Sequence, residues 1–180
     1  MKVLLDTCVL YPTVMREVLL AVARTGAFQP LWSTRILEEW ARAARKLGPT
    51  GEAQARAEIA LVQANWPGAE VTWPPSLENR LYLPDPADVH VLAAAIAGSA
   101  DVLLTMNAKD FPKHTLTEEG LSRQTPDELL YSCWLDAPAP VAEAVEQVRM
   151  TADRLSGQKW DTRKLLKKAR LPRLGKALTR

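Results

Sequence analysis

Cysteine and long apolar runs are both scarce in this 180-residue sequence. Two cysteines, Cys8 and Cys133, are too few for a disulfide framework or a cysteine-rich zinc site. No run approaches the roughly 18 apolar residues that span a bilayer, and the residues after Met1 do not read as a signal peptide. We therefore expect a soluble, cytoplasmic protein with no membrane partner.

The composition is that of an ordinary globular protein, with 47% hydrophobic and 24% charged residues. A chain of this length buries roughly 70% of its unfolded surface, so it can form a core without covalent staples. The net charge of +2 hides an asymmetry. Residues 1–148 hold 12 Lys/Arg and 19 Asp/Glu (−7), whereas residues 149–180 hold 11 and 2 (+9). A basic tail on an acidic body suits contact with phosphates or with an acidic partner.

Alternating hydrophobic patterns predict an α/β fold. Buried strands are expected at 2–5 and 101–105, with a last strand at 120–122 and a short β-rich segment at 70–73. Helices are expected at 13–24 with Thr13 as the cap, at 33–46 with Ser33 as the cap, from 50 to before Pro67, at 88–97, near 115–119 and from 126. This order favours a central, mostly parallel sheet with helices on both faces. We divide the chain into residues 1–136, one domain, and 137–180, a basic helical extension with helices at 141–155 and 161–169.

Acidic side chains follow the predicted strands. Asp6 comes directly after the first strand, and Asn107 and Asp110 follow the second. Asp88 begins the buried helix, and Glu39 lies in the helix capped by Ser33. The carboxyl ends of parallel strands meet at one edge of a sheet, so these groups should converge. Converging carboxylates repel one another, and a hard cation such as Mg²⁺ would offset their charge and activate water.

Four segments of the sequence form an ordered set of motifs: Asp6-Thr-Cys-Val-Leu10, Ser33-Thr-Arg-Ile-Leu-Glu-Glu39, Asp85-Pro-Ala-Asp-Val-His-Val-Leu-Ala-Ala-Ala95 and Leu104-Thr-Met-Asn-Ala-Lys-Asp-Phe111. In this order they resemble the motifs of PIN domains, the nucleases of VapC-type toxins. The resemblance spans roughly residues 1–135. It implies a PIN-like three-layer sandwich and cleavage of single-stranded RNA by a metal-activated water.

The resemblance also implies individual roles. Asp6 and Asp88 match the acids that hold the metal, and Glu39 matches the helical acid that supports the metal or its waters. Asn107 stands where the family has Asp or Asn, and Asp110 is the acid that follows. Thr105, together with Thr7, would support the pocket. The cofactor would be Mg²⁺, with Mn²⁺ as an alternative.

Several assignments stay open at this point. Glu38 competes with Glu39, although the motif register favours Glu39. Asp85 could join the site, but Pro86 suits it better to turn and capping duty. His90 is expected to be a structural histidine, and Cys8 a residue of the core or the pocket wall.

The implied function is an endoribonuclease, the toxin of a type II toxin–antitoxin pair, with an antitoxin protein as partner and a homodimer as a further assembly. Phosphate contacts are expected from four basic residues of the extension: Lys164, Lys167, Lys168 and Arg170. A catalytically weak RNA-binding or regulatory module is the alternative, which Asn107 favours. A small-molecule phosphatase is a third reading, but Cys8 stands where such enzymes usually have a second aspartate.

Overall fold

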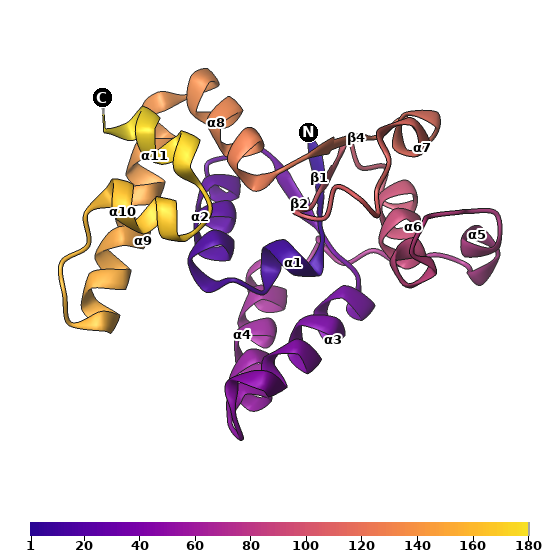
Figure 1. The fold of residues 1–180 in the computed structure, drawn as a ribbon, viewed down its shortest axis with the longest axis horizontal. Helices are drawn as coiled ribbons and strands as arrows, with labels where there is room; N and C mark the ends of the chain where they lie inside the picture. The colour runs from indigo at the N-terminus through magenta and orange to yellow at the C-terminus, as the bar shows by residue number, and fades with distance from the viewer. Residues whose placement is uncertain (180) are drawn as a thin grey trace. The chain divides into compact units, whose positions relative to one another are not determined.

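The computed structural model describes residues 1–179 (Figure 1). Arg180, the last residue of the expected extension, lies outside the described residues. Two compact units are present: residues 1–11 with 29–123, and residues 12–28 with 124–179. None of the helices in residues 1–179 combines the length and the apolar character needed to cross a bilayer. The expected division into residues 1–136 and 137–180 stays a prediction.

The sheet contains β1 (Lys2–Leu5), β2 (Gln29–Leu31), β3 (Val102–Leu104) and β4 (Ser122–Gln124), in the order β2-β1-β3-β4. β1 is central and pairs in parallel with both β2 and β3. Because Leu5 pairs with Leu104, the residues that follow them leave the sheet side by side. The α/β fold class is therefore confirmed, and the carboxyl ends of β1 and β3 open onto a common edge.

The helices of the first unit, except for the first of them, lie between β2 and β4 in the chain. They are α1 (Thr7–Leu10), α3 (Thr34–Ala43), η1 (Ala44–Leu47), α4 (Gly51–Asn65), α5 (Pro75–Asn79), η2 (Pro86–Asp88), α6 (Val89–Ala97) and α7 (Lys113–Glu118). Ser33 caps α3 as predicted, accepting a hydrogen bond from the backbone N–H of Ile36. The apolar helix α6 is buried and packs against β1 and β3. It fixes the residues at its start beside the edge of the sheet.

Some expected elements differ from the structure. Thr13 is already helical, and Pro12 occupies the cap position without a side-chain hydrogen bond. The segment 70–73 is not a strand, because Glu70 makes only a single bridge to Trp32 before the prolines interrupt pairing. β4 begins at Ser122 rather than at residue 120. The short elements β2 and α5 were not expected, since each is three to five residues long and contains proline.

The second unit is helical, with α2 (Thr13–Arg24), α8 (Pro126–Asp136), α9 (Pro138–Ser156), α10 (Thr162–Lys168) and α11 (Pro172–Leu178). α2 packs against α8 and α9, and α11 packs against α8 and α10. The Asp127 carboxylate accepts hydrogen bonds from the backbone N–H groups of Arg173 (2.9 Å) and Leu174 (3.0 Å) at the start of α11. The basic C-terminal segment is thus folded onto a neighbour rather than extended.

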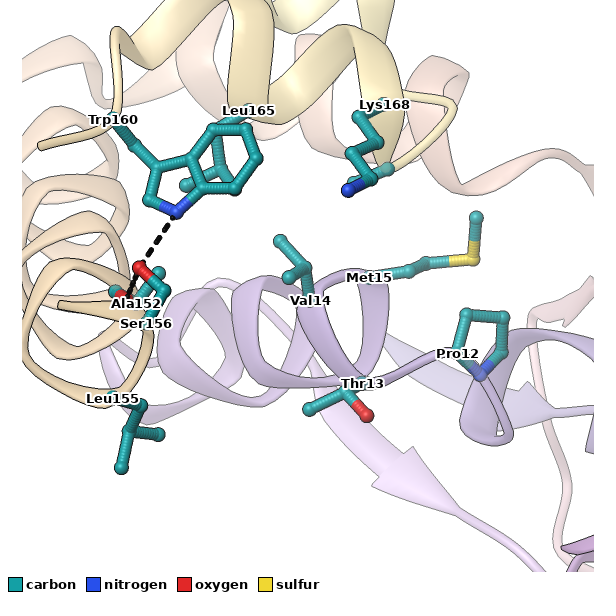
Figure 2. Close-up of a pocket in the computed structure, with 11 residues that line it drawn as sticks. Pro12, Thr13, Val14, Met15, Ala152, Leu155, Ser156, Trp160, Leu165 and Lys168 are labelled. Atoms are coloured by element: carbon teal, nitrogen blue, oxygen red, sulfur yellow. Dashed lines mark hydrogen bonds between the residues drawn. The ribbon is translucent and has the colours of Figure 1, made fainter. Parts of the chain in front are cut away.

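A hollow of about 440 Å³ lies in the second unit, lined by α2, α9, Trp160 and α10 (Figure 2). Its wall is mostly apolar. The indole Nε1 of Trp160 donates to Ser156 Oγ at 3.1 Å, and the ammonium of Lys168 lies 5.1 Å from the centre of the indole ring. Lys168 is therefore engaged in a cation–π contact at the rim of this hollow.

Candidate metal centre

Asp6 is held at the end of β1 by three donors. Its Oδ2 accepts hydrogen bonds from Thr105 Oγ1 (2.8 Å) and from the Cys8 thiol (3.2 Å), and its Oδ1 accepts one from the backbone N–H of Thr7 (2.7 Å). The residue is only 6% exposed. Burial raises the pKa of Asp6, although these three hydrogen bonds oppose the rise. The carboxylate is thus fixed in one orientation by the structure around it.

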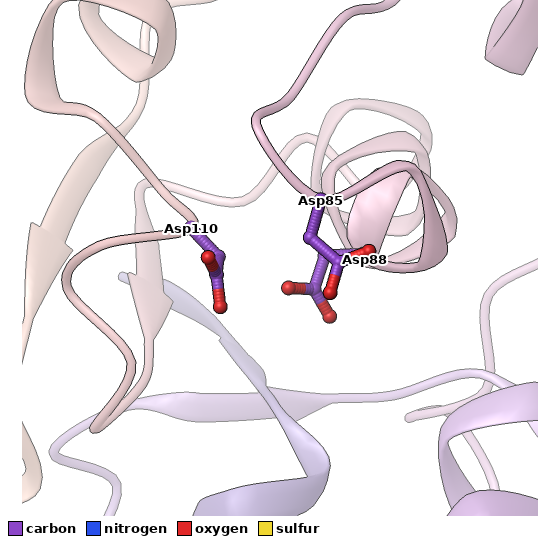
Figure 3. A group of neighbouring side chains, drawn as sticks. All are labelled: Asp85, Asp88 and Asp110. Atoms are coloured by element: carbon purple, nitrogen blue, oxygen red, sulfur yellow. The ribbon is translucent and has the colours of Figure 1, made fainter.

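Three further carboxylates meet at the start of α6 and in the loop after β3. Oxygen atoms of Asp85, Asp88 and Asp110 all lie within 4.8 Å of one another (Figure 3). Asp85 also caps the turn as expected, because its Oδ1 accepts from the backbone N–H of Ala87 at 2.9 Å. Capping and membership of the cluster are therefore compatible for this residue.

Asp88 lies close enough to the other acids of the site to interact electrostatically with each of them. Its pKa is raised to about 6, first by burial and then by the negative charges of Asp6, Asp85, Asp110 and Glu39, in that order. Each of those four carboxylates is therefore close enough to repel charge on Asp88. The structure brings the acids of β1, α3, α6 and the loop after β3 into one neighbourhood, as the sheet argument predicted.

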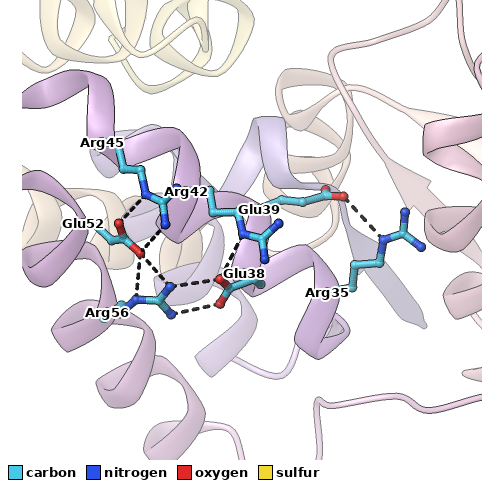
Figure 4. Close-up of polar contacts among 7 residues, drawn as sticks. All are labelled: Arg35, Glu38, Glu39, Arg42, Arg45, Glu52 and Arg56. Atoms are coloured by element: carbon cyan, nitrogen blue, oxygen red, sulfur yellow. Dashed lines mark hydrogen bonds and ion pairs between the residues drawn. The ribbon is translucent and has the colours of Figure 1, made fainter.

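Glu38 and Glu39 have separate surroundings on α3 (Figure 4). Glu38 accepts hydrogen bonds from Arg56 (2.9 Å) and Arg42 (3.1 Å), and these partners lower its pKa to about 2. Glu39 instead accepts a hydrogen bond from Thr7 Oγ1 at 3.0 Å. Glu39 is thus the member of the pair directed to the acidic centre, as the motif register favoured.

Hydrogen bonds hold the loop after β3 near both of its ends. Thr105 Oγ1 accepts a hydrogen bond from the backbone N–H of Asn107 at 3.0 Å, and the Asn107 amide donates to the Asp110 carboxylate. Nη1 of Arg123 donates to the backbone carbonyls of Ala108 (2.8 Å) and Phe111 (2.7 Å). Asn107 therefore reaches the centre through Asp110, and Arg123 holds the loop that carries both.

The Cys8 thiol forms part of the pocket wall. Burial, followed by the charge of Asp6, raises its pKa to about 12, so it remains a protonated donor near neutral pH. It also accepts a hydrogen bond from the backbone N–H of Met106 at 3.3 Å. A protonated thiol is a weak nucleophile, so this environment favours the pocket-wall role expected from the sequence.

Two residues make contacts at the centre beyond those that the sequence favoured. Asp85 caps the turn as expected and also lies in the cluster with Asp88 and Asp110. His90 is buried, and its Nε2 lies 2.7 Å from Oε1 of Glu39. No local pattern signals this contact, because it joins side chains of two separate helices, α3 and α6.

The donor set suits a hard divalent cation. All of the charged groups that raise the pKa of Asp88 are carboxylates, and oxygen ligands are those that Mg²⁺ and Mn²⁺ prefer. A cation bound there would remove the repulsion that keeps part of Asp88 protonated. Asp6 and Asp88 would hold it, with Asp85 and Asp110 beside them.

A family model described as PIN domain matches residues 2–109. This chain belongs to the PIN-domain family. The match includes Asp6, Glu39, Asp88 and Asn107 and ends one residue before Asp110. No curated protein and no solved structure gives a match to the sequence.

Membership of the PIN-domain family supports the prediction that this chain is a nuclease. PIN domains are typically metal-dependent nucleases that act on RNA, and the acidic cluster of this PIN domain agrees with that chemistry. The basic residues of the extension lie outside the match. Lys164, Lys167, Lys168 and Arg170 are exposed on or just after α10 in the second unit.

Proposed function

We propose that this chain is a Mg²⁺-dependent endoribonuclease that hydrolyses RNA phosphodiester bonds, with Mn²⁺ as an alternative ion. The single observation that carries the proposal is the cluster of carboxylates around Asp88, in which oxygen atoms of Asp85, Asp88 and Asp110 lie within 4.8 Å of one another. The negative charges of Asp6 and Glu39 also act on Asp88 and help to raise its pKa. Such a gathering is costly unless a cation binds, and the PIN-domain match gives the chemistry that a bound cation would serve.

Each residue has a distinct task in this proposal. When bound, the ion would lower the pKa of a water molecule and offset the charge of the scissile phosphate. Asp6 and Asp88 would hold the ion, and Thr105 and Thr7 fix the carboxylates of Asp6 and Glu39 through the hydrogen bonds described above. Glu39 would support the ion or the water molecules bound to it.

Asn107 and Asp110 complete the opposite wall. The Asn107 amide donates to Asp110, which orients that carboxylate toward Asp85 and Asp88 without adding a further negative charge. An uncharged residue at position 107 keeps the repulsion among the acids lower than a fifth aspartate would. We propose that this arrangement still supports turnover.

A biological setting for this nuclease is also proposed. We infer a VapC-type toxin of a type II toxin–antitoxin pair, cytoplasmic, with an antitoxin protein as partner and a homodimer as a further assembly. Residues 1–136 would form the nuclease domain and 137–180 the extension. The exposed residues Lys164, Lys167 and Arg170, with Lys168, would contact RNA phosphates.

The test compares the purified chain with its Asp88→Asn variant on a fluorescently labelled single-stranded RNA. We expect Mg²⁺-dependent cleavage by the wild type, none after chelation, and a loss of at least about 100-fold in the variant. The alternative is an RNA-binding module without turnover, favoured by Asn107. It would be supported by RNA binding with no cleavage in Mg²⁺ or Mn²⁺.

A further inference from the structure

His90 lies in the first turn of α6, two residues after Asp88, and is 1% exposed. The residues that follow it on the helix, Val91 to Ala95, are apolar and buried. A buried imidazole loses its hydration, so its ring nitrogens need partners within the protein. An aliphatic side chain at this position would avoid that cost, and the presence of histidine therefore calls for a physical reason.

The partner of His90 is Glu39. Nε2 lies 2.7 Å from Oε1 of Glu39, and within residues 1–179 neither ring nitrogen of His90 makes a hydrogen bond of regular geometry, so this contact is a close approach of the two groups rather than an aligned hydrogen bond. An ionised carboxylate can only accept, so Nε2 must carry the proton for this short contact to be attractive. Within residues 1–179, Glu39 is thus the one carboxylate that the structure places within ion-pair distance of the imidazole.

Glu39 is held on both of its oxygens. His90 contacts Oε1, and Thr7 Oγ1 donates to Oε2 at 3.0 Å. Arg35 lies farther away, with its Nε 3.8 Å from Oε1 on the exposed side. Burial opposes ionisation of Glu39, but the contacts with His90 and Thr7 outweigh it and the pKa of Glu39 is lowered. The ionised carboxylate therefore has a fixed plane, with lone pairs still available to the centre.

We propose that His90 is a positioning residue, which orients the Glu39 carboxylate toward the metal centre from the same helix that supplies Asp88. The inference rests on the proposed function of the acidic site. Asp88 and His90 both belong to the start of α6, so one helix carries the Asp88 carboxylate and the imidazole that lies beside Glu39. Partners that orient site carboxylates in this way commonly contribute about 10–100-fold in metal affinity or activity.

The experiment measures Mn²⁺ affinity directly, by electron paramagnetic resonance of the free ion, alongside RNA cleavage. His90→Leu removes the donor and keeps an apolar side chain, whereas His90→Gln keeps an N–H donor at a similar reach. We expect His90→Leu to weaken Mn²⁺ binding by about 10–100-fold and His90→Gln to restore most of it. His114→Leu, which changes the other, exposed histidine, should match the wild type.

A double-mutant cycle with Glu39→Gln separates positioning from a general loss of structure. If His90 acts through Glu39, adding His90→Leu to Glu39→Gln costs no further Mn²⁺ affinity. Additive losses, or His90→Leu with wild-type affinity, would overturn the proposal. Thermal unfolding without metal checks that each variant is folded. If His90→Leu does not fold, it is replaced by His90→Asn. The asparagine side chain is too short for its amide to reach Glu39, so this variant should bind Mn²⁺ as weakly as His90→Leu.

Imidazole nitrogen chemical shifts give an independent readout. The chain has only two histidines, so their ¹⁵N signals can be assigned by loss in the His114→Leu variant. We expect the Nε2 of His90 to carry a proton, and a signal showing Nε2 without one contradicts the proposal. Failure of the proposed function has a different signature, because a chain that binds Mn²⁺ but cleaves no RNA leaves both of these measurements intact.

Discussion

Thr105 and Asp6 join the ends of two parallel strands through one hydrogen bond, in which Thr105 Oγ1 donates to Asp6 Oδ2 at 2.8 Å. Both residues are buried. Asp6 directly follows β1 and Thr105 directly follows β3, and these two strands pair with each other. The sheet register therefore determines the orientation of the Asp6 carboxylate.

Replacing Thr105 with valine should remove this donor while keeping the shape of the side chain. A buried carboxylate that loses a hydrogen-bond partner costs about 1–3 kcal/mol, so the free energy of unfolding should fall by that amount. Urea denaturation with and without Mg²⁺ measures the change. Thr105→Ser restores the hydroxyl and should recover most of the stability and of the cleavage rate; a valine variant as active as the wild type would show that this hydrogen bond does not orient Asp6.

The raised pKa of Asp88 predicts how stability depends on pH without metal. Its folded-state pKa is about 6 against an ordinary 3.8, so the folded state holds this proton over the interval between them. Stability contributed by this group is full below the ordinary pKa and is lost as pH rises through about 6. The wild type should therefore lose stability relative to Asp88→Asn between pH 5 and pH 7.5.

Differential scanning fluorimetry at the two pH values, with and without Mg²⁺, tests this. Mg²⁺ should remove the loss of stability in the wild type, because the cation offsets the repulsion between ionised Asp88 and the other carboxylates. It should have little effect on Asp88→Asn. Equal pH dependence in the two proteins would mean that Asp88 does not feel its acidic neighbours.

Glu38 and Glu39 offer a matched pair of substitutions on adjacent positions. Glu39→Gln should lower the RNA cleavage rate by about 10–100-fold, because the carboxylate contacts the centre. Glu38→Gln should leave cleavage unchanged, since Glu38 is bonded to Arg56 and Arg42 on the other side of α3. Single-turnover cleavage rates distinguish the two, and reversed effects would reassign the helical acid.

Asp85 should contribute charge to the centre in addition to its cap. Asp85→Asn keeps an oxygen for the Ala87 N–H and removes the charge. We expect weaker Mn²⁺ binding with unchanged thermal stability at pH 7.5, whereas Asp85→Ala should lose both. Isothermal titration of Mn²⁺ provides the measurement; wild-type affinity in Asp85→Asn would restrict this residue to the turn.

Much of this centre follows from the sequence because it depends on strand ends. The buried runs Lys2–Leu5 and Val102–Leu104 are short, apolar and followed at once by polar residues, so the edge of the sheet and the acids along it could be inferred. The start of α6 was predictable for the same reason, since Pro86 and the apolar helix after it define the turn that carries Asp88.

Other contacts depend on tertiary packing that no local pattern encodes. The His90–Glu39 contact joins two helices through side chains whose orientation is set by the way α3 and α6 pack. The clamp of Arg123 on Ala108 and Phe111 likewise links β4 to a loop. β2 escaped prediction because a three-residue strand containing Pro30 becomes a strand only beside β1.

The extension is best tested by substitution rather than deletion. α9 packs against α2, so removing residues 137–180 would uncover an apolar helix. Changing Lys164, Lys167 and Arg170 together to glutamine should weaken RNA binding and reduce the salt slope by about 0.7 per lost phosphate contact. Lys168→Gln should have less effect, because Lys168 is engaged with Trp160. Fluorescence anisotropy between 50 and 200 mM salt, about the range over which phosphate contacts are screened, reports the slope, and an unchanged slope excludes these residues from RNA contact.

The shared cation is tested most directly by an anomalous difference map from crystals grown with Mn²⁺. A single peak with carboxylate oxygens of both Asp6 and Asp88 at about 2.1 Å is the predicted result. A peak that contacts neither residue, or no peak from a protein that cleaves RNA in Mn²⁺, would contradict the account.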